Sequence, residues 1–128
     1  MTGSLPLAID PADRTPIYAQ LERAVRAAIA VGRLRPGDQL PTVRQLAVDL
    51  RINANTVARV YGELERAGVI ETRRGIGSFI TAGRTEARPA EEKSRRLQAF
   101  ARQVLADTGR HGFTVEEVVE ALERERSS

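Results

Sequence analysis

Residues 40–66 read LPTVRQLAVDLRINANTVARVYGELER, and this stretch decides the fold. It predicts one helix from Thr42 and a second helix after Asn53, each with apolar residues at helical spacing. Thr42 and Gln45 have the spacing of a capping box, and asparagine is a favourable N-cap. Only residues 51–53 separate the two helices. Two helices joined by so short a turn are typical of a helix-turn-helix.

The residues on either side complete a winged form of this motif. A preceding helix is predicted to open with Thr15 as its cap and Pro16 as its first residue. After Gly68 the apolar period changes from 3.6 to 2, which predicts short strands over 69–73 and 78–81 joined by a glycine-rich tip. A hairpin directly after the third helix is a wing. The expected fold class is therefore mainly α with a small β-hairpin.

The remaining residues divide the chain into four segments. We expect a tail over 1–14, a winged helix-turn-helix DNA-binding domain over 15–82, a linker over 83–90 and a two-helix dimerisation region over 91–126. The first terminal helix is expected to break at 107–109, an Asp-Thr-Gly sequence. The second is expected to begin with a capping box formed by Thr114 and Glu117.

The two terminal helices carry more apolar surface than two helices hide by themselves, which favours an interface. A second copy is the simplest partner, so a homodimer is expected; the alternative is that the helices pack back on the winged domain. The expected dimerisation residues share one apolar stripe on each helix: Leu97, Phe100, Val104, Leu105, Val115, Val118, Val119 and Leu122.

Composition limits the possible functions. Residues 1–84 hold 12 arginines against 8 acidic residues, whereas residues 85–128 hold 8 basic and 9 acidic residues, as expected for a DNA-binding module followed by a protein-binding one. The chain has no cysteine, which excludes disulfides, thiolate catalysis and the usual zinc sites. No apolar run approaches the roughly 20 residues that span a bilayer. We expect a cytoplasmic, nucleoid-associated protein that is no enzyme and needs no metal, cofactor or membrane.

Other residues of types found in catalytic or metal sites have simpler explanations. Glu116, Glu117 and Glu120 lie near the start of a predicted helix, where acidic side chains favour the helix dipole. His111 stands in a predicted loop without a partner at metal-ligand spacing. Tyr61 falls on the apolar stripe of its helix, which favours core packing over base stacking.

The second helix of a helix-turn-helix enters the major groove with its N-terminal residues at the base edges. Asparagine pairs with adenine, arginine pairs with guanine, and the methyl groups of threonine and alanine contact thymine. The candidate reading residues, all at the start of that helix, are Asn53, Ala54, Asn55, Thr56 and Arg59. Capping alone also explains Asn53.

Two further groups extend the candidate surface to the DNA backbone. Thr42 opens a helix whose free N–H groups favour a phosphate, and Arg44 follows two residues later. The wing joins cations to small residues that let the backbone approach DNA closely: Arg73, Arg74, Gly75 and Gly77. The alternative for the arginines is an ordinary solvated surface.

Two other functions are alternatives to DNA binding. Some winged helices are protein-interaction modules, but these are expected to have an uncharged third helix and no cations in the wing. A fragment of an aminotransferase-fused regulator is the second alternative, and the two well-capped terminal helices argue against it.

Four stretches together resemble the N-terminal domain of GntR-type transcription regulators. They read PIYAQL (16–21), GRLRPGDQLPTVRQLA (32–47), NANTV (53–57) and RGIGSF (74–79). The resemblance implies operator contacts from Arg44, from Asn53, Asn55 and Thr56, and from Gly75. Many relatives have arginine where this chain has Ala54, so its base preference is expected to differ.

The short segment after the wing resembles the YtrA-type branch of that family. About 45 residues remain there, and the single lysine of the chain, Lys93, lies on a charged helix. The resemblance implies that the two terminal helices dimerise and that the protein regulates genes such as those of transporters. We expect a dimeric repressor that binds double-stranded DNA at a palindromic operator. The residues identify no small-molecule effector.

Overall fold

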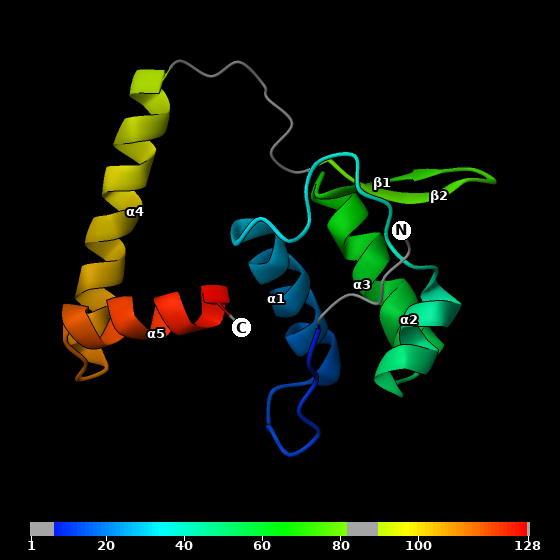
Figure 1. Cartoon of the computed structure of the whole chain (residues 1–128), viewed down its shortest axis with the longest axis horizontal. Coiled ribbons are helices and arrows are strands. Elements are labelled where there is room, and N and C mark those ends of the chain that lie inside the picture. Colours follow the sequence, from blue (N-terminus) through cyan, green and yellow to red (C-terminus); the bar gives the residue numbers. More distant parts are fainter. Residues whose placement is uncertain (1–6, 82–89, 128) are drawn as a thin grey trace. The chain divides into compact units, whose positions relative to one another are not determined.

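The computed structural model describes residues 7–81 and 90–127, and each of these ranges belongs to a separate unit of the chain (Figure 1). The first unit contains α1 (Ile17–Ala30), α2 (Val43–Leu50), α3 (Ala54–Arg66), β1 (Ile70–Arg73) and β2 (Gly77–Ile80). The second unit contains α4 (Ala90–Arg110) and α5 (Val115–Ser127). This arrangement confirms the predicted class, a winged helix-turn-helix followed by two helices.

Side-chain caps define the helix-turn-helix. The Thr42 hydroxyl accepts a hydrogen bond from the Gln45 N–H at 3.1 Å, and the Gln45 side chain accepts one from the Thr42 N–H at 2.9 Å. The Asn53 side chain accepts from the Asn55 N–H at 2.7 Å. Both predicted N-caps are therefore confirmed, and they fix the first turns of α2 and α3.

The turn between α2 and α3 depends on a residue in an unusual conformation. Arg51 has φ 57° and ψ 46°, the left-handed region, and Ile52 then donates its N–H to the Ala47 carbonyl at 3.0 Å. Glycine usually takes this position after a helix, because a side chain there is strained by about 1–2 kcal/mol. Ile52 packs against the core, and this burial offsets the strain.

The core of the first unit is built around α3, which contacts α1, α2 and β1. Val57, Val60 and Leu64 lie on one side of α3 and are completely buried. Tyr61 lies on the same side, and its hydroxyl donates a hydrogen bond to the Pro41 carbonyl at 2.8 Å. Burial also raises the pKa of Tyr61 well above its usual value. Tyr61 is thus a core residue, as predicted.

The segment before α1 differs in detail from the sequence expectation. Pro16 is itself the N-cap of α1 and no side chain caps this end, so the prediction of Thr15 as cap was wrong. Within the expected tail, Leu7 and Ile9 pack against the core. The buried Gln20 amide accepts the Asp10 N–H at 2.9 Å and donates to the Asp10 carbonyl at 3.0 Å. These contacts hold residues 7–10 against α1.

The predicted break at 107–109 in the first terminal helix was wrong, because α4 continues to Arg110. The helix is terminated instead by Gly112, which lies just beyond its last residue and has a φ of 80°. The Phe113 N–H donates to the Thr108 carbonyl at 3.0 Å, and the Gly112 N–H donates to the Gly109 carbonyl at 3.1 Å. This pair of bonds is a Schellman motif, which places the stop after residues 107–109.

We predict that Tyr61→Phe lowers the free energy of unfolding by about 1 kcal/mol, because the Pro41 carbonyl loses its donor while the ring stays packed. Urea unfolding followed by circular dichroism measures the change. Tyr18→Phe is the matched control, since the Tyr18 hydroxyl has no hydrogen-bond partner within residues 7–81 and 90–127. Equal stability losses in the two variants would contradict the assigned role of Tyr61.

Candidate nucleic-acid interface

The wing is a two-stranded antiparallel hairpin with a tightly defined tip. Arg73 pairs with Gly77 and Thr72 pairs with Ser78 across the strands. The Ile76 N–H donates to the Arg73 carbonyl at 3.0 Å, which closes a four-residue turn. The third residue of this turn is Gly75 with φ 78°, a conformation that glycine adopts without strain. The hairpin extends away from α3, as Figure 1 shows.

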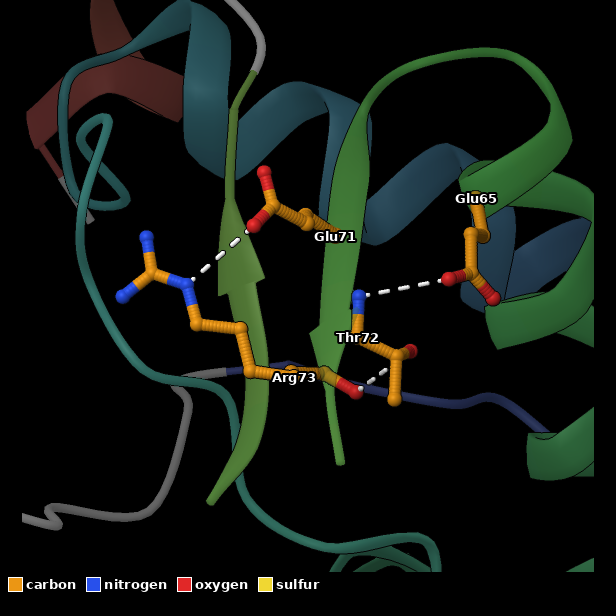
Figure 2. Close-up of polar contacts among 5 residues, drawn as sticks. Glu65, Glu71, Thr72 and Arg73 are labelled. Atoms are coloured by element: carbon orange, nitrogen blue, oxygen red, sulfur yellow. Dashed lines mark hydrogen bonds and ion pairs between the residues drawn. The ribbon is translucent and has the colours of Figure 1, made fainter. Parts of the chain in front are cut away.

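Both edges of the wing are held by other parts of the first unit. Along β2, the Leu40 N–H donates to the Ser78 carbonyl at 2.8 Å, so the segment that leads into α2 lies against this strand. Along β1, the Thr72 N–H donates to the Glu65 carboxylate at 3.2 Å (Figure 2). Because Glu65 belongs to α3, the wing is attached both to the expected recognition helix and to the segment before α2.

The sequence-predicted residues on α3 do not all lie on its exposed side. Ala54, Asn55 and Arg59 are exposed, opposite the buried stripe, as a reading surface requires. Thr56 is half-buried and lines a hollow with Ile9, on the side of α3 toward the N-terminal segment. The exposed surface of α3 is thus centred on Asn55 and Arg59 rather than on Thr56.

Two of the four candidate arginines are engaged within the protein. The Arg59 guanidinium lies 3.9 Å from the centre of the Tyr18 ring, and its Nε is 3.2 Å from the Glu63 carboxylate. The Arg73 guanidinium lies 4.5 Å from the centre of the Phe79 ring, and its Nε is 3.2 Å from Glu71 (Figure 2). Exposed ion pairs of this kind contribute at most about 1 kcal/mol, so a phosphate can compete for either arginine.

The other two candidate arginines are available without such competition. Arg44 and Arg74 are exposed and make no ion pair within the residues that the structure describes. Arg44 lies in the first turn of α2, two residues after the Thr42 cap. Arg74 lies in the turn at the tip of the wing. The two free cations therefore come from two different elements of the winged unit.

Sequence reasoning missed the residues that hold the candidate surface in place. Glu63 is four residues after Arg59, a helical spacing that does predict an ion pair. Tyr18, Glu65 and Gln39 carried no local signal, since each acts on a residue distant in the sequence. Gln39 is the clearest case, because its amide donates to the Ile76 carbonyl 37 positions away at 2.9 Å.

Comparison with known proteins is consistent with this geometry. Residues 17–80 match the family described as bacterial regulatory proteins, gntR family. The chain is 38% identical over 112 residues to the HTH-type transcriptional repressor YtrA of Bacillus subtilis, covering 88% of this chain and 85% of that protein. This chain belongs to the GntR family. It is a DNA-binding transcription regulator and not an enzyme, and its resemblance to the YtrA-type branch is confirmed.

Solved structures of GntR-type proteins show the same fold. YtrA from Sulfolobus acidocaldarius aligns with a TM-score of 0.56 and 31% identity over 78% of this chain and 97% of that chain. The DNA-binding domain of AraR, solved in complex with operator ORX1, aligns with a TM-score of 0.52 and 25% identity over 59% of this chain and 93% of that chain. The DNA-bound relative thus matches a part of this chain that is about the size of the winged unit.

The described residues hold neither a metal cluster nor a membrane-spanning helix. Within residues 7–81 and 90–127, histidine and acidic residues form no group of three or more that could hold a metal ion. Over the same residues, no helix combines the length and the apolar character needed to cross a membrane.

Proposed function

We propose that this GntR-family regulator is a homodimeric repressor that binds a palindromic operator, with α3 in the major groove and the wing at the minor groove or the flanking phosphates. One observation carries the proposal. The exposed side of α3, opposite its fully buried stripe, presents Asn55 at the helix start, where side chains of a helix-turn-helix reach base edges. The name of the Bacillus subtilis relative supports repression.

Asn55 and Arg59 are the residues we assign to base reading. The Asn55 side chain is exposed, while its backbone N–H is already used by the Asn53 cap. Its side-chain amide makes no hydrogen bond within residues 7–81 and 90–127, so it can pair with adenine. Arg59 reaches guanine after leaving Glu63. Ala54 offers a methyl group to thymine, whereas half-buried Thr56 contributes less than the sequence suggested.

The contacts to the DNA backbone are assigned to the start of α2 and to the tip of the wing. The free N–H groups at the start of α2, next to Thr42 and Arg44, favour one phosphate. In the wing, Arg74 adds an exposed cation, and Arg73 adds a second when it leaves Glu71. Gly75 lets the chain approach the DNA closely because it has no side chain, and no described atom outside residues 74–76 lies within 4 Å of the position that a Cβ would occupy.

Dimerisation is assigned to α4 and α5. Six of the eight apolar residues predicted for this role are between 44% and 67% exposed, and Val104 and Val118 are half-buried. Pairing with a second copy removes such a surface from water and relates two recognition helices by a two-fold axis. The two half-sites are then expected about one turn of DNA apart, or at a similar spacing. Binding there blocks transcription by occlusion, on cytoplasmic DNA.

Selection from a pool of random duplexes tests the proposed function directly. The intact chain is expected to enrich an inverted repeat. Asn55→Ala is expected to lose preference at one base pair of each half-site, at a cost of about 1–3 kcal/mol. Enrichment of no sequence would contradict sequence-specific binding and favour a protein-interaction module. If the intact chain and the Asn55→Ala variant enriched the same motif, Asn55 would not be a base-reading residue.

We predict that Arg44→Ala and Arg74→Ala each lower the slope of log affinity against log salt by about 1, because each loses one phosphate contact. Fluorescence anisotropy with the selected duplex at several salt concentrations measures the slope. Arg26→Ala is the matched control: it removes one positive charge from α1, where Arg26 pairs with Glu22 at 3.2 Å. An unchanged slope in both test variants, or an equal change in the control, would contradict the phosphate assignment.

We predict that Phe100→Glu converts the dimer to a monomer, because the new charge would be buried in an apolar interface. Light scattering of the full chain gives the mass, and anisotropy gives the accompanying loss of operator affinity. Ala99→Glu is the matched control, since it places the same charge next to Phe100 but off the apolar stripe. A wild-type monomer, or a dimeric Phe100→Glu variant, would overturn this assignment of α4.

A further inference from the structure

The tip of the wing presents an apolar side chain among charged ones. Ile76 is 64% exposed, and within residues 7–81 only Val48 is another large apolar side chain with comparable exposure. Arg73 and Arg74 precede Ile76 in the same turn. An exposed isoleucine is not stabilised by contact with water. Together with the two cations, it suits a partner whose interior is apolar and whose outer surface is negatively charged.

The position of Ile76 is fixed by contacts that do not involve its side chain. Its N–H donates to the Arg73 carbonyl, and its carbonyl accepts the Gln39 amide at 2.9 Å. Gln39 also forms a backbone bridge with Phe79 on β2, so its own main chain is held. The Gln39 side chain therefore holds the wing tip from outside the hairpin, and the main chain of Gln39 is itself held against β2.

Gly77 leaves the space that the Gln39 amide occupies. A Cβ at Gly77 would lie 2.5 Å from the Gln39 Nε2, which is closer than any ordinary contact. The φ of Gly77 is 140°, a conformation that other residues rarely adopt. Glycine at this position thus serves the Gln39 contact, which the sequence reading of Gly77 as a point of DNA approach did not include.

We propose that Gln39 is a positioning residue that holds the wing tip so that Ile76 contacts the floor of the minor groove at A·T base pairs. The inference rests on the proposed DNA binding and names a specificity for the wing. Minor grooves distinguish A·T from G·C mainly by the guanine N2 amino group. That group projects into the groove, where it would collide with Ile76 and lose its bound water.

Two general properties of the minor groove support this choice. Apolar side chains, isoleucine among them, are inserted into minor grooves by other DNA-binding proteins. A·T-rich stretches also have a narrow groove with enhanced negative potential, which attracts arginine. Arg74 is exposed, makes no ion pair within residues 7–81 and 90–127, and lies close to Ile76 in the turn, so both properties favour the same base pairs.

Inosine substitution tests the inference, because an inosine·cytosine pair lacks the N2 amino group but keeps the major-groove pattern of G·C. Hydroxyl-radical footprinting of the intact chain on its selected operator locates the wing segment. Duplexes carrying A·T, G·C or I·C there are compared by anisotropy. Wild type is expected to bind A·T and I·C within about twofold of each other, and G·C at least about fivefold more weakly.

Variants then assign the effect to residues. Ile76→Ala and Gln39→Met should reduce the G·C penalty to within about twofold, because one removes the apolar contact and the other removes the amide donor at similar length. Val48→Ala should keep the full penalty, since it removes an exposed apolar side chain from α2 instead. Gln39→Ala is a second test of the same contact. Circular dichroism melting checks that the variants are folded. If the role of Gln39 were purely structural, the melting of the Gln39 variants would change.

The outcomes separate the inference from the proposed function. Enrichment of no sequence by the wild type would remove the proposed function itself. Specific binding with equal affinity for the A·T and G·C duplexes would overturn the minor-groove reading alone. A full G·C penalty in Ile76→Ala would overturn the role of Ile76. A full penalty in both Gln39 variants would overturn the role of Gln39.

Discussion

The burial of one side of α3 is the constraint on which the other features depend. Val57, Val60 and Leu64 are completely buried there, and each such side chain contributes about 1.5–3 kcal/mol relative to exposure. Three elements, α1, α2 and β1, pack against this helix. The same helix carries the exposed residues Asn55 and Arg59 on its other side. Stability and recognition therefore use opposite sides of one element, and a change that rotates α3 would damage both.

A small set of polar contacts converts this packing into a defined surface. Tyr61 connects α3 to Pro41, directly before the Thr42 cap of α2. Glu65 connects α3 to Thr72 in β1, and Gln39 connects the segment before α2 to Ile76 at the wing tip. Through these contacts the start of α2, the exposed side of α3 and the wing are held in one arrangement. The groups assigned to DNA are thus positioned before binding, which lowers the ordering cost of association.

Local signals made most of the fold predictable from the sequence. The Thr42 and Asn53 caps, the apolar spacing of α3 and Gly75 in the wing turn each depend on neighbours within four residues. Features that depend on distant residues were not predictable: the packing of residues 7–10 through Gln20, the left-handed Arg51 and the contact from Gln39 to the wing tip. The wrongly predicted break at 107–109 has a different and local cause. A glycine within a helix costs only about 1 kcal/mol, and the αL conformation of Gly112 sets the end.

Chemical-shift mapping of the isotope-labelled intact chain, free and bound to its selected operator, tests the central claim most directly. The account predicts that the largest backbone changes fall at three places: the start of α2 from Thr42 to Arg44, the start of α3 from Asn53 to Arg59, and the wing turn from Arg73 to Gly77. Buried residues such as Leu64 should change little. Large changes confined to other surfaces, with these three segments unaffected, would contradict the account.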